Sequence, residues 1–234
     1  MYKRQALAVV TVLGPRNGKY AYDGTPNLMP GSNIPMAALG AWILWLGWFG
    51  FNGGSELKVS EVSSATAVSQ VFLNTNLAAA GGVLAAMFMS LAVTGKMDVT
   101  MAINGAIAGL VSITADPLSP SAGTAVIVGA IGGAIVYASI VFLEKAGIDD
   151  PVGAISAHGT VGIWGVLVVS LTGGSSFGGQ LIGVLMIAGF TYLASLGTIL
   201  VIDKLIMPIR ASDAEQEAGL DISEVGIEAY PEFK

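Results

Sequence analysis

The feature that most constrains this chain is a series of apolar segments that are long enough to cross a lipid bilayer. A hydrocarbon core about 30 Å thick requires about 20 helical residues. Because backbone groups inside lipid must satisfy their own hydrogen bonds, each such segment is expected to be a helix. Six spans are predicted, near residues 34–54, 66–94, 99–116, 122–144, 151–173 and 178–206.

The composition indicates an all-α protein, a polytopic membrane helix bundle. Charged residues make up 11% of the 234 residues, whereas soluble domains carry about 25%. Cysteine is absent, which excludes disulfides and cysteine metal sites. The net charge of −6 comes mostly from the last thirty residues, and there is no basic patch that would bind nucleic acid.

The start of the chain does not fit a complete span. Residues 6–13 are apolar but short, so we interpret them as the remnant of a truncated transmembrane helix and residues 1–5 as a non-native start. The apolar stretch ends in Gly14-Pro15-Arg16 without the small-residue cleavage site of a signal peptide. The chain is therefore expected to be the later part of a longer protein. The predicted organisation continues with a cytoplasmic loop at 14–33, six transmembrane helices within 34–206 and a cytoplasmic tail at 207–234.

The loop charges predict the orientation in the membrane. Cytoplasmic loops carry an excess of Lys and Arg. If residues 14–33 are cytoplasmic, six basic residues lie inside and only Lys58 lies outside. We therefore expect a protein of the cell (inner) membrane with its C-terminus in the cytoplasm. The six basic residues are Arg16, Lys19, Lys96, Lys145, Lys204 and Arg210.

Glycine is abundant, with 32 residues, and several lie inside the predicted spans. Small residues let helices approach closely where lipid removes the hydrophobic driving force. The patterns Gly105-x-x-x-Gly109 and Gly129-x-x-x-Gly133, and the pair Gly81-Gly82, therefore predict close helix packing. No chemical role is assigned to them.

The one histidine of the chain, His158, lies inside the fifth predicted span. Asp150 and Pro151 are interpreted as the N-cap and the first helical residue, which places His158 about 12 Å along the helix, near the bilayer midplane. An ionisable residue at that depth is costly and is a functional candidate by default. The alternative is a neutral histidine bonded to a neighbouring carbonyl. Small neighbours favour an open lane beside the ring: Ala154, Ala157, Gly159 and Gly162.

Aromatic residues close the first predicted span and allow two interpretations. Trp48 and Phe49 fit the aromatic belt found at membrane interfaces. Phe51 lies near the outer surface and precedes the polar stretch Asn52-Gly53-Gly54-Ser55, which favours a residue at a pore mouth.

The parts that enzyme chemistry needs are missing. No span carries a carboxylate pair, no nucleophile elbow or phosphate loop occurs, and a single histidine cannot hold a metal ion. We therefore expect no enzyme activity, no cofactor and no metal. The other polar residues in spans are uncharged and are more often interhelical hydrogen-bond partners than ligands: Asn74, Asn76, Asn104 and Thr114.

Four stretches, in order, resemble the ammonium transporter (Amt) family. In that family two five-helix halves of opposite orientation surround a pore, and an eleventh helix wraps the outside. The resemblance implies the second, C-terminal half of this inverted-repeat fold, from the end of helix five through helix eleven and the tail. The stretches are GWFGFNGGS (47–55), NGAIAGLVSITA (104–115), DDPVGAISAHGTVGIWG (149–165) and GLDISEVGIEAYPEF (219–233).

The resemblance also implies roles for individual residues. Phe51 resembles one of the two phenylalanines that gate the pore, and Ser55 resembles the hydroxyl of the outer recruitment site for ammonium. His158 resembles the second of the twin pore histidines. Asp150 corresponds to an acid at the foot of the same helix. Weaker pore-lining assignments fall on Asn104, Ile107, Thr114 and Ala154.

The implied function is ammonium or ammonia transport through a hydrophobic pore lined by histidine. The implied partners are the lipid bilayer, two further copies in a homotrimer, and a PII-type signal protein at the tail. The tail is either a solvated acidic segment or a segment docked on the cytoplasmic face. Alone, this fragment is expected to be inactive, because a half-pore leaves Phe51 and His158 facing lipid. The alternatives are an ammonium sensor with the same fold and an inactive structural membrane fragment.

Overall fold

A computed structural model of the chain describes residues 3–231. Within this range the secondary structure is helical, apart from an isolated bridge between Tyr20 and Pro26. The all-α prediction is therefore confirmed. The long helices are α1 (Lys3–Leu13), α2 (Ile34–Gly53), α3 (Val62–Thr94), α4 (Val99–Ile113), α5 (Ala122–Lys145), α6 (Val161–Thr172) and α7 (Phe177–Val201). The short elements are η1 (Gly54–Glu56), η2 (Ile155–Thr160), η3 (Ile202–Ile206), α8 (Asp213–Ala218) and η4 (Asp221–Val225).

Five of these helical segments are long and apolar enough to cross a membrane: 34–56, 62–94, 122–145, 155–172 and 177–206. The sixth predicted span, 99–116, is shorter in the structure. Helix α4 ends at Ile113 because Asp116-Pro117 follows, and the residue before a proline disfavours helical geometry. Its 15 residues cover about 22 Å. Every residue from Gly105 to Leu110 is buried, so protein rather than lipid surrounds the middle of α4.

Glycines hold α3, α4 and α5 in close contact at the centre of the bundle. A methyl group on Gly109 or on Gly129 would overlap the carbonyl oxygen of Ala78 in α3. A methyl group on Gly133 would overlap that of Gly82. These helices therefore touch through backbone atoms, and the close packing predicted from the small-residue patterns is confirmed.

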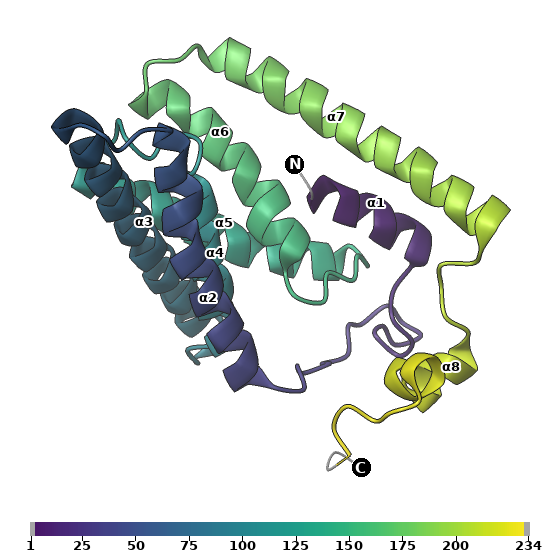
Figure 1. Ribbon diagram of the computed structural model, residues 1–234. Coiled ribbons are helices and arrows are strands. Elements are labelled where there is room, and N and C mark those ends of the chain that lie inside the picture. The colour runs from purple at the N-terminus through teal and green to yellow at the C-terminus, as the bar shows by residue number, and fades with distance from the viewer. Residues whose placement is uncertain (1–2, 232–234) are drawn as a thin grey trace.

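Helix α7 lies apart from this bundle. Figure 1 shows α2 to α5 grouped together, α6 beside them, and α7 running along the far side with α1 between α6 and the end of α7. Residues 3–5, which were predicted to be a non-native start, continue α1, whereas residues 1 and 2 lie outside the described range. The candidate site is lined by residues of both α6 and α7.

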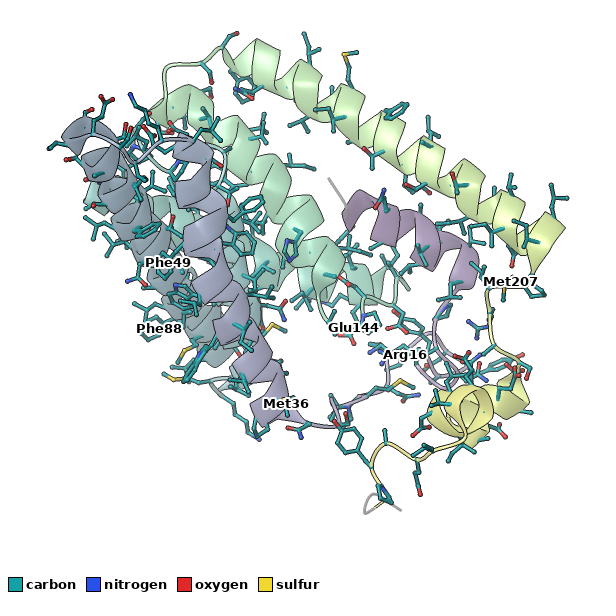
Figure 2. The ribbon with its side chains drawn as sticks, viewed as in Figure 1. Arg16, Met36, Phe49, Phe88, Glu144 and Met207 are labelled. Carbon is teal, nitrogen blue, oxygen red and sulfur yellow. The ribbon has the colours of Figure 1, made fainter. Side chains whose placement is uncertain are left out.

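The loop 14–33 is held at one end of the molecule by ionic and polar contacts. The guanidinium of Arg16 donates two hydrogen bonds of 2.8 Å to the buried carboxylate of Asp149. Lys19 Nζ, also buried, lies 2.6 Å from a carboxylate oxygen of Glu144. Figure 2 shows Arg16 and Glu144 at this same end. The loop is thereby fastened to the end of α5 and to the turn that follows it.

The tail packs against the same loop. The guanidinium of Arg210 donates to the carbonyl oxygens of Leu13 and Pro15, at 2.7 and 2.8 Å. The amide of Asn17 donates to the carboxylate of Asp213, at 2.9 Å. The start of the tail, at Arg210 and Asp213, is thus fastened to the loop, while docking of the segment 219–233 on the cytoplasmic face stays a prediction.

The Arg16–Asp149 pair predicts a pH-dependent contribution to stability. Burial acts to raise the pKa of the Asp149 carboxyl, but the hydrogen bonds and charge of Arg16 outweigh it and hold that pKa below its ordinary value. The stabilisation is therefore fully present above about pH 4 and is lost as the pH falls through the lowered pKa. Asp149→Asn should cost roughly 2 kcal/mol at neutral pH.

The measurement is thermal unfolding in detergent between neutral pH and pH 3. The difference between wild type and Asp149→Asn should shrink at the acid end. Glu61→Gln is the control, because Glu61 pairs with Lys58 on an exposed surface, and it should change the melting temperature little. A difference at Asp149 that is the same at every pH would contradict the assignment.

Candidate functional site

A cavity of about 510 Å³ opens between α2, α4, α6 and α7. Most of its wall is apolar or glycine, and three glycines of η2 and α6 follow one another along it: Gly159, Gly162 and Gly165. Because glycine has no side chain, these residues leave space along the wall, and the cavity is wide enough for a small molecule. The other lining residues are Trp48, Val111, Thr114, Ala115, His158, Val166, Gln180, Gly183, Val184 and Ile187.

His158 is the one titratable side chain among the residues that line this cavity. It is half-buried on the π-helical turn η2, and its ring stacks on Trp48 with centroids 6.1 Å apart and planes at 30°. The residues just before it, Ile155, Ser156 and Ala157, are buried against the bundle. One side of the turn therefore packs against the bundle, and the other side carries the imidazole that lines the cavity.

Trp48 is a site residue that the sequence interpretation missed. Its side chain is half-buried and lines the cavity, a position that the aromatic-belt interpretation did not include. Its indole N–H donates to Thr114 Oγ1 at 2.8 Å, and its ring meets Phe51 edge to face at 6.0 Å. The signal available in the sequence was the spacing of three between Trp48 and Phe51, which puts both on one helix face. Phe49 points elsewhere and packs on Phe72.

Phe51 and Ser55 lie at and just beyond the C-terminal end of α2. Phe51 is 66% exposed and extends the row of rings that continues through Trp48 to His158. Ser55 lies in the short turn η1 and is exposed, and its hydroxyl donates to the carbonyl oxygen of Phe51 at 3.0 Å. Because that bond uses its only proton, the Ser55 oxygen is left as a hydrogen-bond acceptor.

Asp150 caps the helix that carries His158, but the helix begins later than predicted. One oxygen of Asp150 accepts the backbone N–H groups of Ile155 and Ser156, at 2.9 and 3.1 Å. Pro151 lies in a turn rather than at the first helical position. Gly153 ends this turn with φ +69°, and a Cβ there would lie 2.6 Å from Asn104 Oδ1. His158 is therefore within the first turn of the observed helix, not two turns above its start.

The weaker pore-lining assignments separate in the structure. Thr114 lines the cavity and receives the Trp48 hydrogen bond. Ile107 is buried in the hydrophobic core with Ala157 and Val161. Asn104 donates to the carbonyl oxygen of Thr100 in its own helix, and Ala154 is half-buried beside the turn. Of these four residues, Thr114 alone is placed with His158.

Comparisons with known proteins agree with one another. The profile of the Ammonium Transporter Family matches residues 4–230. The ammonium transporter Amt2 of Archaeoglobus fulgidus is 42% identical over 97% of this chain and 52% of its own length. The ammonium transporter Amt2 of Methanocaldococcus jannaschii is 37% identical over 97% of this chain and 53% of its own. These relatives are transporters, not enzymes.

Solved structures share the fold. A sensor Amt protein superimposes with a TM-score of 0.89 at 34% identity, over 95% of this chain and 56% of that protein. Mep2 of Candida albicans gives a TM-score of 0.79 at 26% identity, over 91% and 50%. The chain thus spans about half the length of the relatives that it matches. With a profile match over nearly all of its residues, this multi-pass membrane protein belongs to the ammonium transporter family.

Proposed function

We propose that the protein containing this chain moves ammonium or ammonia across the membrane through a hydrophobic, histidine-lined pore, and that this chain supplies the C-terminal half of that pore. The observation that carries the proposal is the position of His158, which faces a cavity walled by glycines and stacks on Trp48. Family membership supports the substrate.

The row from Ser55 to His158 supports a mechanism in three steps. An ammonium ion loses water at a cost that the Ser55 oxygen and the ring of Phe51 offset in part, through a hydrogen bond and a cation–π contact. Once the ion passes a proton to water at the pore mouth, neutral ammonia enters the apolar lane much more readily than the ion. His158 then acts as hydrogen-bond partner or proton relay, because an imidazole can donate, accept and exchange a proton.

The remaining parts of the proposal concern location and assembly. The basic residues of the loop 14–33, and Arg210 of the tail, support placing that end in the cytoplasm of a cell-membrane protein. Exposed apolar side chains on α2 and α3, such as Trp42, Phe72 and Phe88, are suited to lipid or to two further copies in a homotrimer. The docked tail offers an acidic surface to a PII-type signal protein.

Uptake assays test the function directly. In cells that lack their own ammonium transporters, the complete natural gene product that contains this chain should take up labelled methylammonium. The 234-residue chain alone should give no uptake above the empty-vector background, because Phe51 and His158 then face lipid. Robust uptake by the isolated chain would show that these residues need no opposing half, and absence of uptake by the complete product would contradict transport.

A second candidate function is ammonium sensing, which the similarity to the sensor Amt protein favours. A sensor would bind ammonium at Phe51 and Ser55 without net movement across the membrane. Binding of ammonium to the purified complete product, together with uptake at background level, would favour sensing over transport.

A further inference from the structure

Three hydroxyl groups form a cluster between α5 and the π-helical turn that carries His158. Ser139 Oγ of α5 lies 3.0 Å from Ser156 Oγ and 2.9 Å from Thr160 Oγ1. Ser156 is fully buried and Ser139 is 9% exposed. None of the three lines the cavity, and the mechanism proposed above assigns them no role.

The direction of these bonds ties both ends of the turn to one atom. The Ser139 hydroxyl donates to Ser156. A hydroxyl carries a single proton, so the bond between Ser139 and Thr160 must be donated by Thr160. Ser139 Oγ is therefore hydrogen-bonded near the start of η2 through Ser156 and at its last residue through Thr160. Ser139 and Ser156 are buried from water, which makes such bonds strong and their loss costly.

The geometry relates this cluster to the imidazole. Residues four apart on a helix share a face, and a residue midway between them lies on the opposite side. Ser156 and Thr160 are fixed to α5, so His158 is directed away from α5 and toward the cavity and Trp48. The backbone N–H of Val161 bonds to the carbonyl oxygen of Ser156, five residues earlier, and this spacing is the hydrogen-bond pattern of a π-helix.

We propose that Ser139, Ser156 and Thr160 are positioning residues, which hold η2 on α5 so that the His158 imidazole faces the cavity. The cluster acts through the backbone of the turn and does not touch the transported molecule. The inference rests on the function proposed above for its effect on transport. Its effect on the orientation of the ring is independent of that function.

The transport test uses the complete gene product with Thr160→Val, which keeps the shape of the side chain and removes the hydroxyl. A misplaced reactive group can cost as much as a hundredfold in rate, so kcat for methylammonium uptake should fall at least about tenfold. KM should stay near that of wild type, because Ser55 and Phe51 are unchanged. Thr160→Ser, which restores the hydroxyl, should recover kcat.

The orientation test reads the imidazole by NMR with ¹⁵N-labelled histidine, in which the His158 signals are identified by their loss in His158→Ala. Thr160→Val should shift these signals and Thr160→Ser should return them. Ser112→Ala is the control, because it removes a buried hydroxyl that donates to the carbonyl oxygen of Ala108 in its own helix. It should leave both the signals and kcat unchanged.

The outcomes separate the two proposals. A Thr160→Val protein with wild-type imidazole signals and wild-type kcat, altered only in melting temperature, would overturn the positioning role. Wild-type protein without uptake would overturn the transport function, while the NMR comparison still decides the orientation of His158. If Thr160→Val protein is not recovered, Ser139→Ala removes the shared oxygen and gives the same test.

Discussion

Replacing His158 with alanine is expected to slow methylammonium uptake by the complete gene product at least about tenfold, or to admit potassium in competition, while the protein still assembles. Loss of a proton-exchanging group commonly costs a hundredfold or more. Assembly should persist because the ring lies in the wall of an open cavity rather than in the packed core. Uptake at saturating substrate, potassium competition and detergent melting curves measure the three quantities.

A control on the same helix distinguishes this role from packing. Ile163 is 36% exposed and does not line the cavity. Ile163→Ala should therefore leave uptake and selectivity near wild type. If His158→Ala kept normal transport but the protein collapsed in detergent, the histidine would be a packing residue and the proposed pore would lose its central group.

The second large effect concerns the bundle. Gly129→Ala is expected to destabilise the protein by about 3 kcal/mol, at the upper end of what overpacking usually costs. Its new methyl group would overlap the backbone of Ala78, which cannot move aside as a flexible side chain could. Helices α3 and α5 would have to separate. Melting temperature and the yield of folded protein in detergent report the loss.

Gly123 provides the matched control. It lies on the same helix, and a Cβ there meets no atom within 4 Å. Gly123→Ala should be neutral or slightly stabilising, since alanine favours helix more than glycine does. Equal destabilisation by both substitutions would point to helix flexibility rather than close contact as the function of these glycines.

The sequence predicted the small-residue contacts well because their cause is local. A pattern of glycines four residues apart marks one face of a helix, whatever partner that face meets. It predicted the start of the His158 helix wrongly, because Asp150-Pro151 satisfies the local rules for a helix start. What delays the start is Gly153, held against Asn104 of another helix. A contact with another helix cannot be predicted from the residues that neighbour Gly153 in the sequence.

Trp48 illustrates the same limit within the candidate site. Its position near the end of an apolar span is equally compatible with a membrane interface and with a pore wall. Its place in the cavity wall is shown only by tertiary contacts, the hydrogen bond to Thr114 and the stacking on His158, and both partners are more than 60 residues away in sequence. By contrast, His158 could be singled out from the sequence because an ionisable residue in an apolar span is conspicuous by itself.

The amino-acid sequence by itself determined that this protein is a set of apolar helices in a membrane, since in lipid each segment must satisfy its backbone within itself. It also determined that one imidazole lies among them. The tertiary structure alone decided which faces meet. It paired Arg16 with Asp149, placed Trp48 on His158, and joined Ser139 to the turn that carries the imidazole. Such contacts depend on side chains that are brought together only when helices from distant parts of the chain pack.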